Sequence, residues 1–282
     1  RPAELPTVAR YAVAGAVRPK LTEALLIGER VRRVLMGCSR KQNGGNCSFI
    51  FSGKAADGTP HMDAASAHGH AHFLSESNGD QEHGRISHVT IFAPAGFSRS
   101  DELALRRYIP TDGQGEHDLQ YVLLGIGHPE DFGGLNSKKG QSPMLASGTE
   151  WISRTPFVPA DRLRRKYNLN DPAEHRRCQL DLARIIRKEL SRREWLAEHA
   201  QHLQFVEAIL DPNELGTMLG GTRTSWLKFR RERTRGGGRR GSSIGFGLRL
   251  TFAREVQGPI AVGYGAHFGL GLFVPATLGQ DT

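Results

Sequence analysis

The alternation of apolar and polar positions predicts a first group of elements before residue 128. Strands are expected over residues 7–17, 68–72, 84–94 and 119–126. The last of these is a continuous apolar run, which indicates a buried strand. An apolar stripe at helical spacing predicts an amphipathic helix over 21–36, and a shorter helix is expected over 100–108. The resulting order, strand–helix–strand–strand–helix–strand, is that of the ferredoxin-like, split βαβ unit.

A second group of elements follows residues 129–148, which have the composition of a linker. Strands are expected over 150–159, 225–233, 244–252 and the C-terminal end, and helical segments over 172–193 and 195–210. We therefore predict an α+β protein with two ferredoxin-like (RRM-like, βαββαβ) domains in tandem. They would occupy residues 1–128 and 149–282, and the second would carry a glycine-rich C-terminal loop.

Composition narrows the class of protein. The 282 residues carry a formal net charge of +9, which favours a polyanionic partner such as nucleic acid. The three cysteines form no CxxC pair, which argues against a disulfide framework or structural zinc and favours a reducing cytoplasm. The sequence shows neither a membrane-spanning run nor a signal peptide. Because it lacks an initiator Met, we expect a fragment or a processed product.

The segment from Gly258 to Phe273 combines strand-forming side chains with five glycines. Glycine at this density weakens a strand, so it indicates a tight bend or the close approach of another backbone or a ligand. Exposed backbone amides beside a basic surface would suit a polyphosphate backbone. The alternative is a glycine-rich final hairpin packed into a sheet.

Two basic clusters lie in the second half. The window 223–240 holds eight Lys or Arg residues and one Glu, with Trp226 and Phe229 among them. As a strand it would place Lys228 and Arg230 on one face and Arg231 on the other. The second cluster, 162–166, precedes a helix that is itself rich in arginine. Clusters this dense favour RNA or DNA over a merely solvated face, with contacts to phosphates. The candidate RNA-binding residues are Arg164, Arg165, Lys166, Lys228, Arg230, Arg231, Arg233, Arg239, Arg240, Gly263, Gly265, His267, Gly269 and Gly271.

Histidines form a second candidate site. His61, His68, His70 and His72 fall within a dozen residues, and His83 and His88 follow. In a strand, the three at 68–72 would share one face. They could then ligate a transition metal, or one could act as a general base on a ribose 2′-hydroxyl. Surface histidines on an edge strand are the plainer alternative, particularly for His72, His83 and His88.

Four motifs in order carry a resemblance to a known family. They are FSGKAADGTP from Phe51, HGHAHFLS from His68, GDQEHGRISHVTIFAP from Gly79 and GAHFGLGLF from Gly265. This combination resembles the CRISPR-associated RAMP proteins, and most closely the fused repeat-processing proteins of subtype I-U, also called I-G. The C-terminal stretch is similar to the glycine-rich loop of that superfamily. The acidic turn before Gly84 departs from the family pattern, and so does the absence of a preceding half that resembles a backbone subunit.

The resemblance implies a metal-independent endoribonuclease that cleaves precursor CRISPR RNA within its repeats and needs no cofactor. In that family a histidine after the first helix is the general base, for which His68 and His70 are the candidates here. Lys54 would neutralise charge developing on the phosphorus. Attack by the 2′-hydroxyl would leave a 2′,3′-cyclic phosphate. The implied partners are the repeat RNA, the mature guide RNA and other subunits of a type I effector complex.

Two alternatives remain open at this point. One is a metal-dependent nuclease built on His68, His70 and His72. The other is a non-catalytic subunit that retains the guide RNA.

Overall fold

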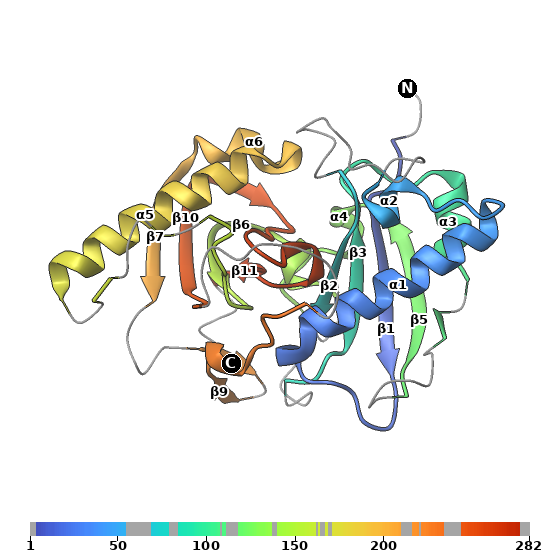
Figure 1. The fold of residues 1–282 in the computed structure, drawn as a ribbon. Coiled ribbons are helices and arrows are strands. Elements are labelled where there is room, and N and C mark those ends of the chain that lie inside the picture. Colours follow the sequence, from blue (N-terminus) through green and yellow to red (C-terminus); the bar gives the residue numbers. More distant parts are fainter. Residues whose placement is uncertain are drawn as a thin grey trace.

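The computed structural model describes residues 4–54, 69–78, 84–107, 109–110, 118–136, 140–161, 163, 167–168, 171–209, 216–219, 221–233 and 244–276. The fold is α+β, with two main antiparallel sheets that lie side by side and carry helices on their outer faces (Figure 1). Within the described ranges, no helix combines enough length and apolar character to cross a lipid bilayer.

The N-terminal sheet has the strand order β2-β3-β1-β5-β4. Its strands are β1 (Val8–Ala14), β2 (His72–Glu76), β3 (His88–Phe92), β4 (Ile109–Pro110) and β5 (Gln120–Gly127). Helix α1 (Ala24–Gln42) connects β1 to β2, with the short α2 (Phe49–Ser52) after it, and α3 (Arg99–Leu105) follows β3. Helix α1 begins after a single 3-10 turn, η1 (Leu21–Glu23), and lies across the sheet (Figure 1). Its apolar side chains close the first core, which explains why the helical periodicity was readable from the sequence.

The C-terminal sheet has the order β11-β6-β10-β7. Its strands are β6 (Ser147–Ser153), β7 (Leu203–Ile209), β10 (Gly247–Gln257) and β11 (Phe273–Pro275). Helices α5 (Pro172–Ser191) and α6 (Glu194–Ala200) cover one face of it (Figure 1). A two-stranded ribbon, β8 (Thr217–Leu219) with β9 (Thr222–Thr224), and the 3-10 turn η6 (Trp226–Lys228) lie between β7 and β10 in the chain.

The two sheets share one strand order when the strands are counted within each half. Leaving out the two-residue β4, which pairs with β5 at one edge, the last strand of each sheet pairs with its first, the first with the third and the third with the second. The halves differ before this last strand. There the first half has α3, while the second has the glycine-rich segment, with one 3-10 turn, η7 (Ala266–Phe268).

An apolar cluster joins the two halves. It combines Val8, Leu74 and Phe92 of the first sheet with Met144, Leu145, Ala261, Ala266 and Leu272 of the second half. Arg154, at the end of β6, adds a polar link, because it donates to Met218 O at 2.6 Å and to Ser77 O at 2.9 Å. Burial lowers the pKa of this guanidinium to about 10.

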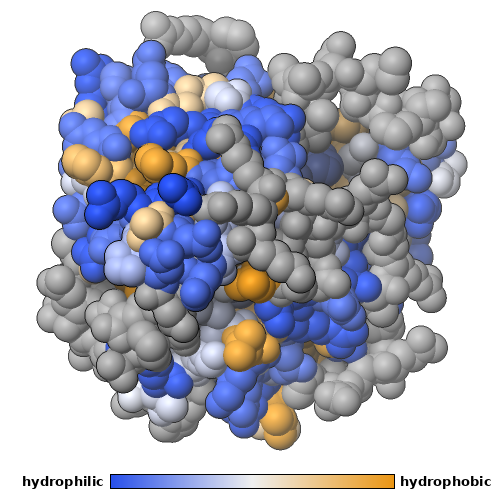
Figure 2. All heavy atoms as spheres, turned by 60° about the vertical axis from the view of Figure 1, so that its left-hand side comes forward, coloured by the Kyte–Doolittle hydropathy of each residue, from blue (hydrophilic) through white to orange (hydrophobic). Residues whose placement is uncertain are grey.

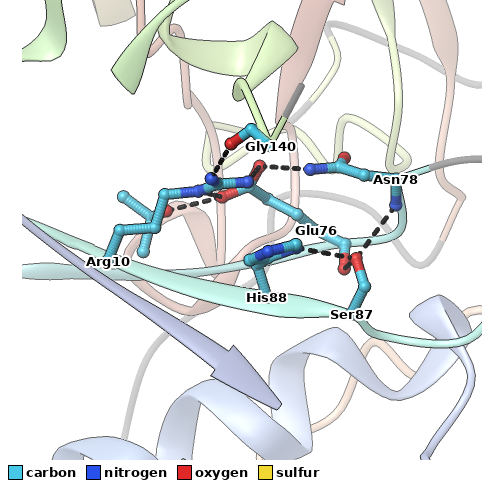
Figure 3. Close-up of polar contacts among 7 residues, drawn as sticks. Arg10, Glu76, Asn78, Ser87, His88 and Gly140 are labelled. Atoms are coloured by element: carbon cyan, nitrogen blue, oxygen red, sulfur yellow. Dashed lines mark hydrogen bonds and ion pairs between the residues drawn. The ribbon is translucent and has the colours of Figure 1, made fainter. Parts of the chain in front are cut away.

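A buried ion pair lies on the face of the first sheet that is turned away from α1. Arg10 Nε and Nη2 each lie 3.2 Å from a carboxylate oxygen of Glu76, and both side chains are almost fully buried (Figure 3). Thr90 Oγ1 donates to the same carboxylate at 2.5 Å, and Arg10 also donates to Gly140 O. Burial raises the pKa of Glu76, but Arg10 and the hydrogen bonds outweigh that effect and the net shift is downward. The pair thereby ties the first sheet to the segment around Gly140.

Four expectations about elements were wrong. The strand expected over 68–72 is β2 (His72–Glu76), so His70 precedes the strand and His68 lies outside the described residues. Residues 195–210 are not one helical piece, because α6 ends at Ala200 and the following residues form β7, which pairs with β10. Residues 225–233 are not a strand. Ser225 accepts from Leu227 N at 3.3 Å and starts η6, which turns Trp226 and Phe229 together into the first core. Strand β5 is buried on one face only, since Val122 and Leu124 are about half exposed.

The predicted linker, residues 129–148, carries structure of its own. It contains α4 (Pro129–Phe132) and the 3-10 turn η5 (Pro143–Leu145), and Met144 and Leu145 are fully buried. The apolar cluster between the halves therefore includes part of this segment. The division into domains at 1–128 and 149–282 stays a prediction.

Candidate functional site

The glycine-rich segment forms a tight turn that presents His267. Gly265 and Gly269 flank η7 with φ angles of 74° and 85°, a conformation that favours glycine. Thr155 holds the turn from below: its Oγ1 donates to Gly269 O at 2.8 Å and accepts from Leu272 N at 3.0 Å. The position of His267 is thus set by a buried hydroxyl at the end of β6.

The amides of this segment are engaged within the protein. Gly263 N donates to Glu189 Oε2 at 3.1 Å, and Gly271 N donates to Pro156 O at 3.0 Å. Gly269 N donates to Ala266 O at 3.3 Å. The expectation that these three amides are free to face a polyphosphate is therefore wrong.

Close packing explains two of these glycines instead. A Cβ at Gly271 would lie 1.9 Å from Val262 O, and one at Gly263 would lie 2.6 Å from Val158 O. Close packing within the protein thus accounts for both positions.

Three imidazoles from two distant parts of the chain meet at this turn. The ring centroid of His267 lies 4.0 Å from that of His70, edge to face, and 3.9 Å from that of His72, stacked. His267 Nδ1 also lies 3.4 Å from Ala71 O. His72 opens β2 and is 1% exposed, whereas His70 precedes the strand and, like His267, is half-buried. The spacing of two residues does turn His70 and His72 toward one neighbour, and that neighbour is His267.

Of the other histidines in the predicted cluster, the structure describes one. His88 lies on β3 away from this site, and its Nδ1 is 3.0 Å from Ser87 Oγ (Figure 3). His61, His68 and His83 lie outside the described residues. Of the two predicted general bases, only His70 therefore has a described position.

Lys54 lies on a turn packed against His70. Gly53 has a φ angle of 65°, and a Cβ there would lie 2.4 Å from His70 Cδ2, so this turn contacts the imidazole directly. Ser52 Oγ accepts from Lys54 N at 3.1 Å, and the Lys54 side chain is exposed. Lys54, the predicted cation, is thus the residue after Gly53, whose backbone contacts His70, the predicted general base.

Arg32 fixes this turn and is a site residue that the sequence reading did not single out. Its Nε donates to Phe51 O at 3.0 Å, and its Nη2 donates to Ser52 O. The guanidinium also lies 5.8 Å from the centre of the Phe268 ring. On α1 it was one of several charged residues outside the apolar stripe, and only its tertiary contacts distinguish it.

Arg233, from the basic window 223–240, contacts the same Phe268 ring. Its guanidinium carbon lies 4.7 Å from the centre of the Phe268 ring, and its Nε lies 3.0 Å from Glu29 Oε1. Burial lowers the pKa of Arg32, and the charge of Arg233 lowers it further. Two partly desolvated cations here lie beside one carboxylate, Glu29, an arrangement that favours the binding of an anion.

The remaining basic residues are distributed around the second half. Lys228 and Arg230 are exposed, Arg231 is half-buried, and Arg164, Arg165, Lys166, Arg239 and Arg240 lie outside the described residues. Trp226 and Phe229 are 3% and 2% exposed, so they belong to the core and offer no stacking surface to a base. The side of the molecule that carries α5 is mainly hydrophilic, with small separate apolar groups (Figure 2).

No protein-family model, curated protein or solved structure matches the chain. Among the residues with described positions, no group of three His, Cys, Asp or Glu side chains is arranged to hold a metal ion.

Proposed function

We propose that the protein is an endoribonuclease that cleaves precursor CRISPR RNA within its repeats, without a metal ion, by attack of a ribose 2′-hydroxyl. One observation carries the proposal: His70 from the first half and His267 from the glycine-rich segment are in contact, with 4.0 Å between their ring centroids. Cationic residues lie in the surroundings: Lys54 follows Gly53, whose backbone contacts His70, and the guanidiniums of Arg32 and Arg233 lie 5.8 Å and 4.7 Å from the centre of the ring of Phe268, the residue after His267. Imidazole together with fixed cations is the equipment that cleavage of a phosphodiester requires.

The fold supports the same proposal. Apart from the two-residue β4, the strands of each half follow the order of the split βαβ unit, which supports a tandem ferredoxin-like fold for the chain. The second unit departs from the pattern, because the glycine-rich segment replaces its second helix. A glycine-rich segment at this place in the fold agrees with the resemblance carried by the sequence motifs.

In the proposed reaction, His70 accepts the proton of the 2′-hydroxyl that lies 5′ of the scissile phosphate. The oxygen attacks phosphorus in line, and a 2′,3′-cyclic phosphate and a 5′-hydroxyl result. Lys54 and Arg32 stabilise the negative charge that develops on the phosphoryl oxygens. Proton transfer by such a base contributes roughly 10²–10⁴ in rate. The exposed Lys228 and Arg230, with the basic residues outside the described ranges, would hold the repeat hairpin by its phosphates and shape.

The decisive experiment uses end-labelled repeat RNA with a single 2′-deoxy substitution at the attacking nucleotide, each RNA with and without EDTA. We expect cleavage of the all-ribose RNA in EDTA, ends that carry a cyclic phosphate, and no cleavage at the 2′-deoxy site. Cleavage that persists at the 2′-deoxy position would refute this chemistry. Loss of cleavage in EDTA would favour the metal-dependent nuclease, while tight binding without any cleavage would favour the guide-retaining subunit.

A further inference from the structure

The contacts of His267 fix which of its nitrogens can take part in chemistry. Nδ1 faces the backbone carbonyl of Ala71, an oxygen that can only accept a hydrogen bond. The proton of the neutral ring therefore belongs on Nδ1. With Nδ1 engaged by this carbonyl, Nε2 is the nitrogen from which His267 would release a proton to a substrate.

We infer that His267 is the general acid of the proposed reaction and protonates the 5′-oxygen that leaves phosphorus, while His70 takes the 2′-proton. The inference rests on the proposed function. The bond from 2′-oxygen to phosphorus forms as the bond from phosphorus to 5′-oxygen breaks. One proton moves to His70 and one leaves His267, so charge and atoms balance. Two imidazoles in contact can reach the two oxygens, because both oxygens are bonded to the same phosphorus.

His72 does not compete for this role. It is 1% exposed and enclosed by His267, by Trp195 at 5.3 Å and by Phe92 at 6.2 Å between ring centroids. It therefore supports the ring of His267 from behind and has no path to a substrate. The half-buried His70 and His267 are the two imidazoles of this group that RNA can reach.

The contact between the two rings also offers a route by which their protonation states can be restored after a turnover. After one turnover, His70 holds an extra proton and His267 lacks one. At a centroid separation of 4.0 Å, the proton can return directly or through one water molecule. Charged groups nearby include Arg32 and Arg233 at the Phe268 ring and Glu29, which pairs with Arg233.

The test compares His267→Asn with His70→Asn on two RNAs. Asn keeps an N–H close to the position of Nδ1, so it can still donate to Ala71 O, but it cannot transfer a proton. One RNA is unmodified, and the other carries sulfur in place of the 5′-bridging oxygen at the cleavage site. A thiol has a pKa of about 8.5, so a departing thiolate needs no proton from an acid.

We expect His267→Asn to cleave unmodified RNA roughly 10²–10⁴-fold more slowly than the unaltered protein. On the sulfur-containing RNA it should recover to within about tenfold of that protein, whereas His70→Asn should stay slow on both. His128→Asn, outside the site, serves as the matched control, and RNA binding and melting temperature show that each variant is folded. If His267→Asn does not fold, His267→Gln replaces it.

An equal loss by His267→Asn on both RNAs would overturn the acid role, because a purely structural defect does not depend on the leaving atom. A rate unchanged on unmodified RNA would overturn it as well. Failure of the unaltered protein to cleave either RNA would instead contradict the proposed function. The two failures are therefore distinguishable.

Discussion

Replacing Thr155 by Val tests whether one buried hydroxyl holds the glycine-rich turn in place. Val keeps the shape of Thr but removes Oγ1, which leaves Gly269 O without its donor at 2.8 Å and Leu272 N without its acceptor at 3.0 Å. Thr155 is 0% exposed, so water does not replace the lost partner without rearrangement. Each orphaned buried group costs about 1–3 kcal/mol, so the free energy of unfolding should fall by about 2–6 kcal/mol.

Thermal unfolding followed by calorimetry measures this cost, and at roughly 2–4 °C per kcal/mol the expected fall in Tm is roughly 4–24 °C. RNA cleavage should fall further than stability alone explains at a temperature where the variant is still folded, because the turn carries His267. Thr155→Ser is the matched control: it keeps the hydroxyl and loses one methyl group, at about 1 kcal/mol. A Thr155→Val protein as stable and active as Thr155→Ser would refute the reasoning.

Three further predictions concern other contacts of the fold and the site. The pKa of Glu76 is lowered in the folded state, so its stabilising effect is complete above the ordinary value of 4.5 and is lost as the pH falls from that value through the lowered pKa of the folded state. The difference in stability between the unaltered protein and Glu76→Gln should shrink between pH 7 and pH 3 in urea unfolding, and a constant difference would contradict the ion pair with Arg10. Gly53→Ala should lower the free energy of unfolding by about 1–2 kcal/mol, because residue 53 has a left-handed backbone, and should displace His70. Cleavage should therefore fall while RNA binding persists, and unchanged cleavage would show that this turn does not determine the position of the imidazole. Arg32→Lys keeps the charge but loses the fork that donates to Phe51 O and Ser52 O, so cleavage should fall at least tenfold, and activity equal to that of the unaltered protein would exclude a geometric role for the guanidinium.

Elements with strong periodicity were predictable from the sequence. Helices α1 and α5 and strand β3 fall where the apolar pattern placed them, because each buries one continuous apolar face. The prediction of one helical segment over residues 195–210 was wrong because a seven-residue helix and a strand follow one another there with only two residues between them. The prediction of a strand over residues 225–233 was wrong because the spacing of Trp226 and Phe229, three residues apart, suits a 3-10 turn as well as a short irregular strand.

The candidate site was predictable only in its parts. The histidines near residue 70, Lys54 and the glycine-rich segment were identified from residue type and from motif order. That His267 lies between His70 and His72 was not predictable, because the contact joins positions almost 200 residues apart and depends on how two sheets dock. Arg32 was missed for the same reason, since its partners lie on α2 and its ring contact is with Phe268.

The apolar cluster that joins the two halves has a consequence for how the protein can be controlled. His70 and His72 come from the first half and His267 from the second, so their contact depends on the packing of the cluster that includes Leu74, Phe92, Ala266 and Leu272. On the proposed function, a slight separation of the halves would stop cleavage while both sheets stayed intact. A binding partner that separates the halves at this cluster would lower the rate of cleavage, and one that binds across the cluster would maintain it.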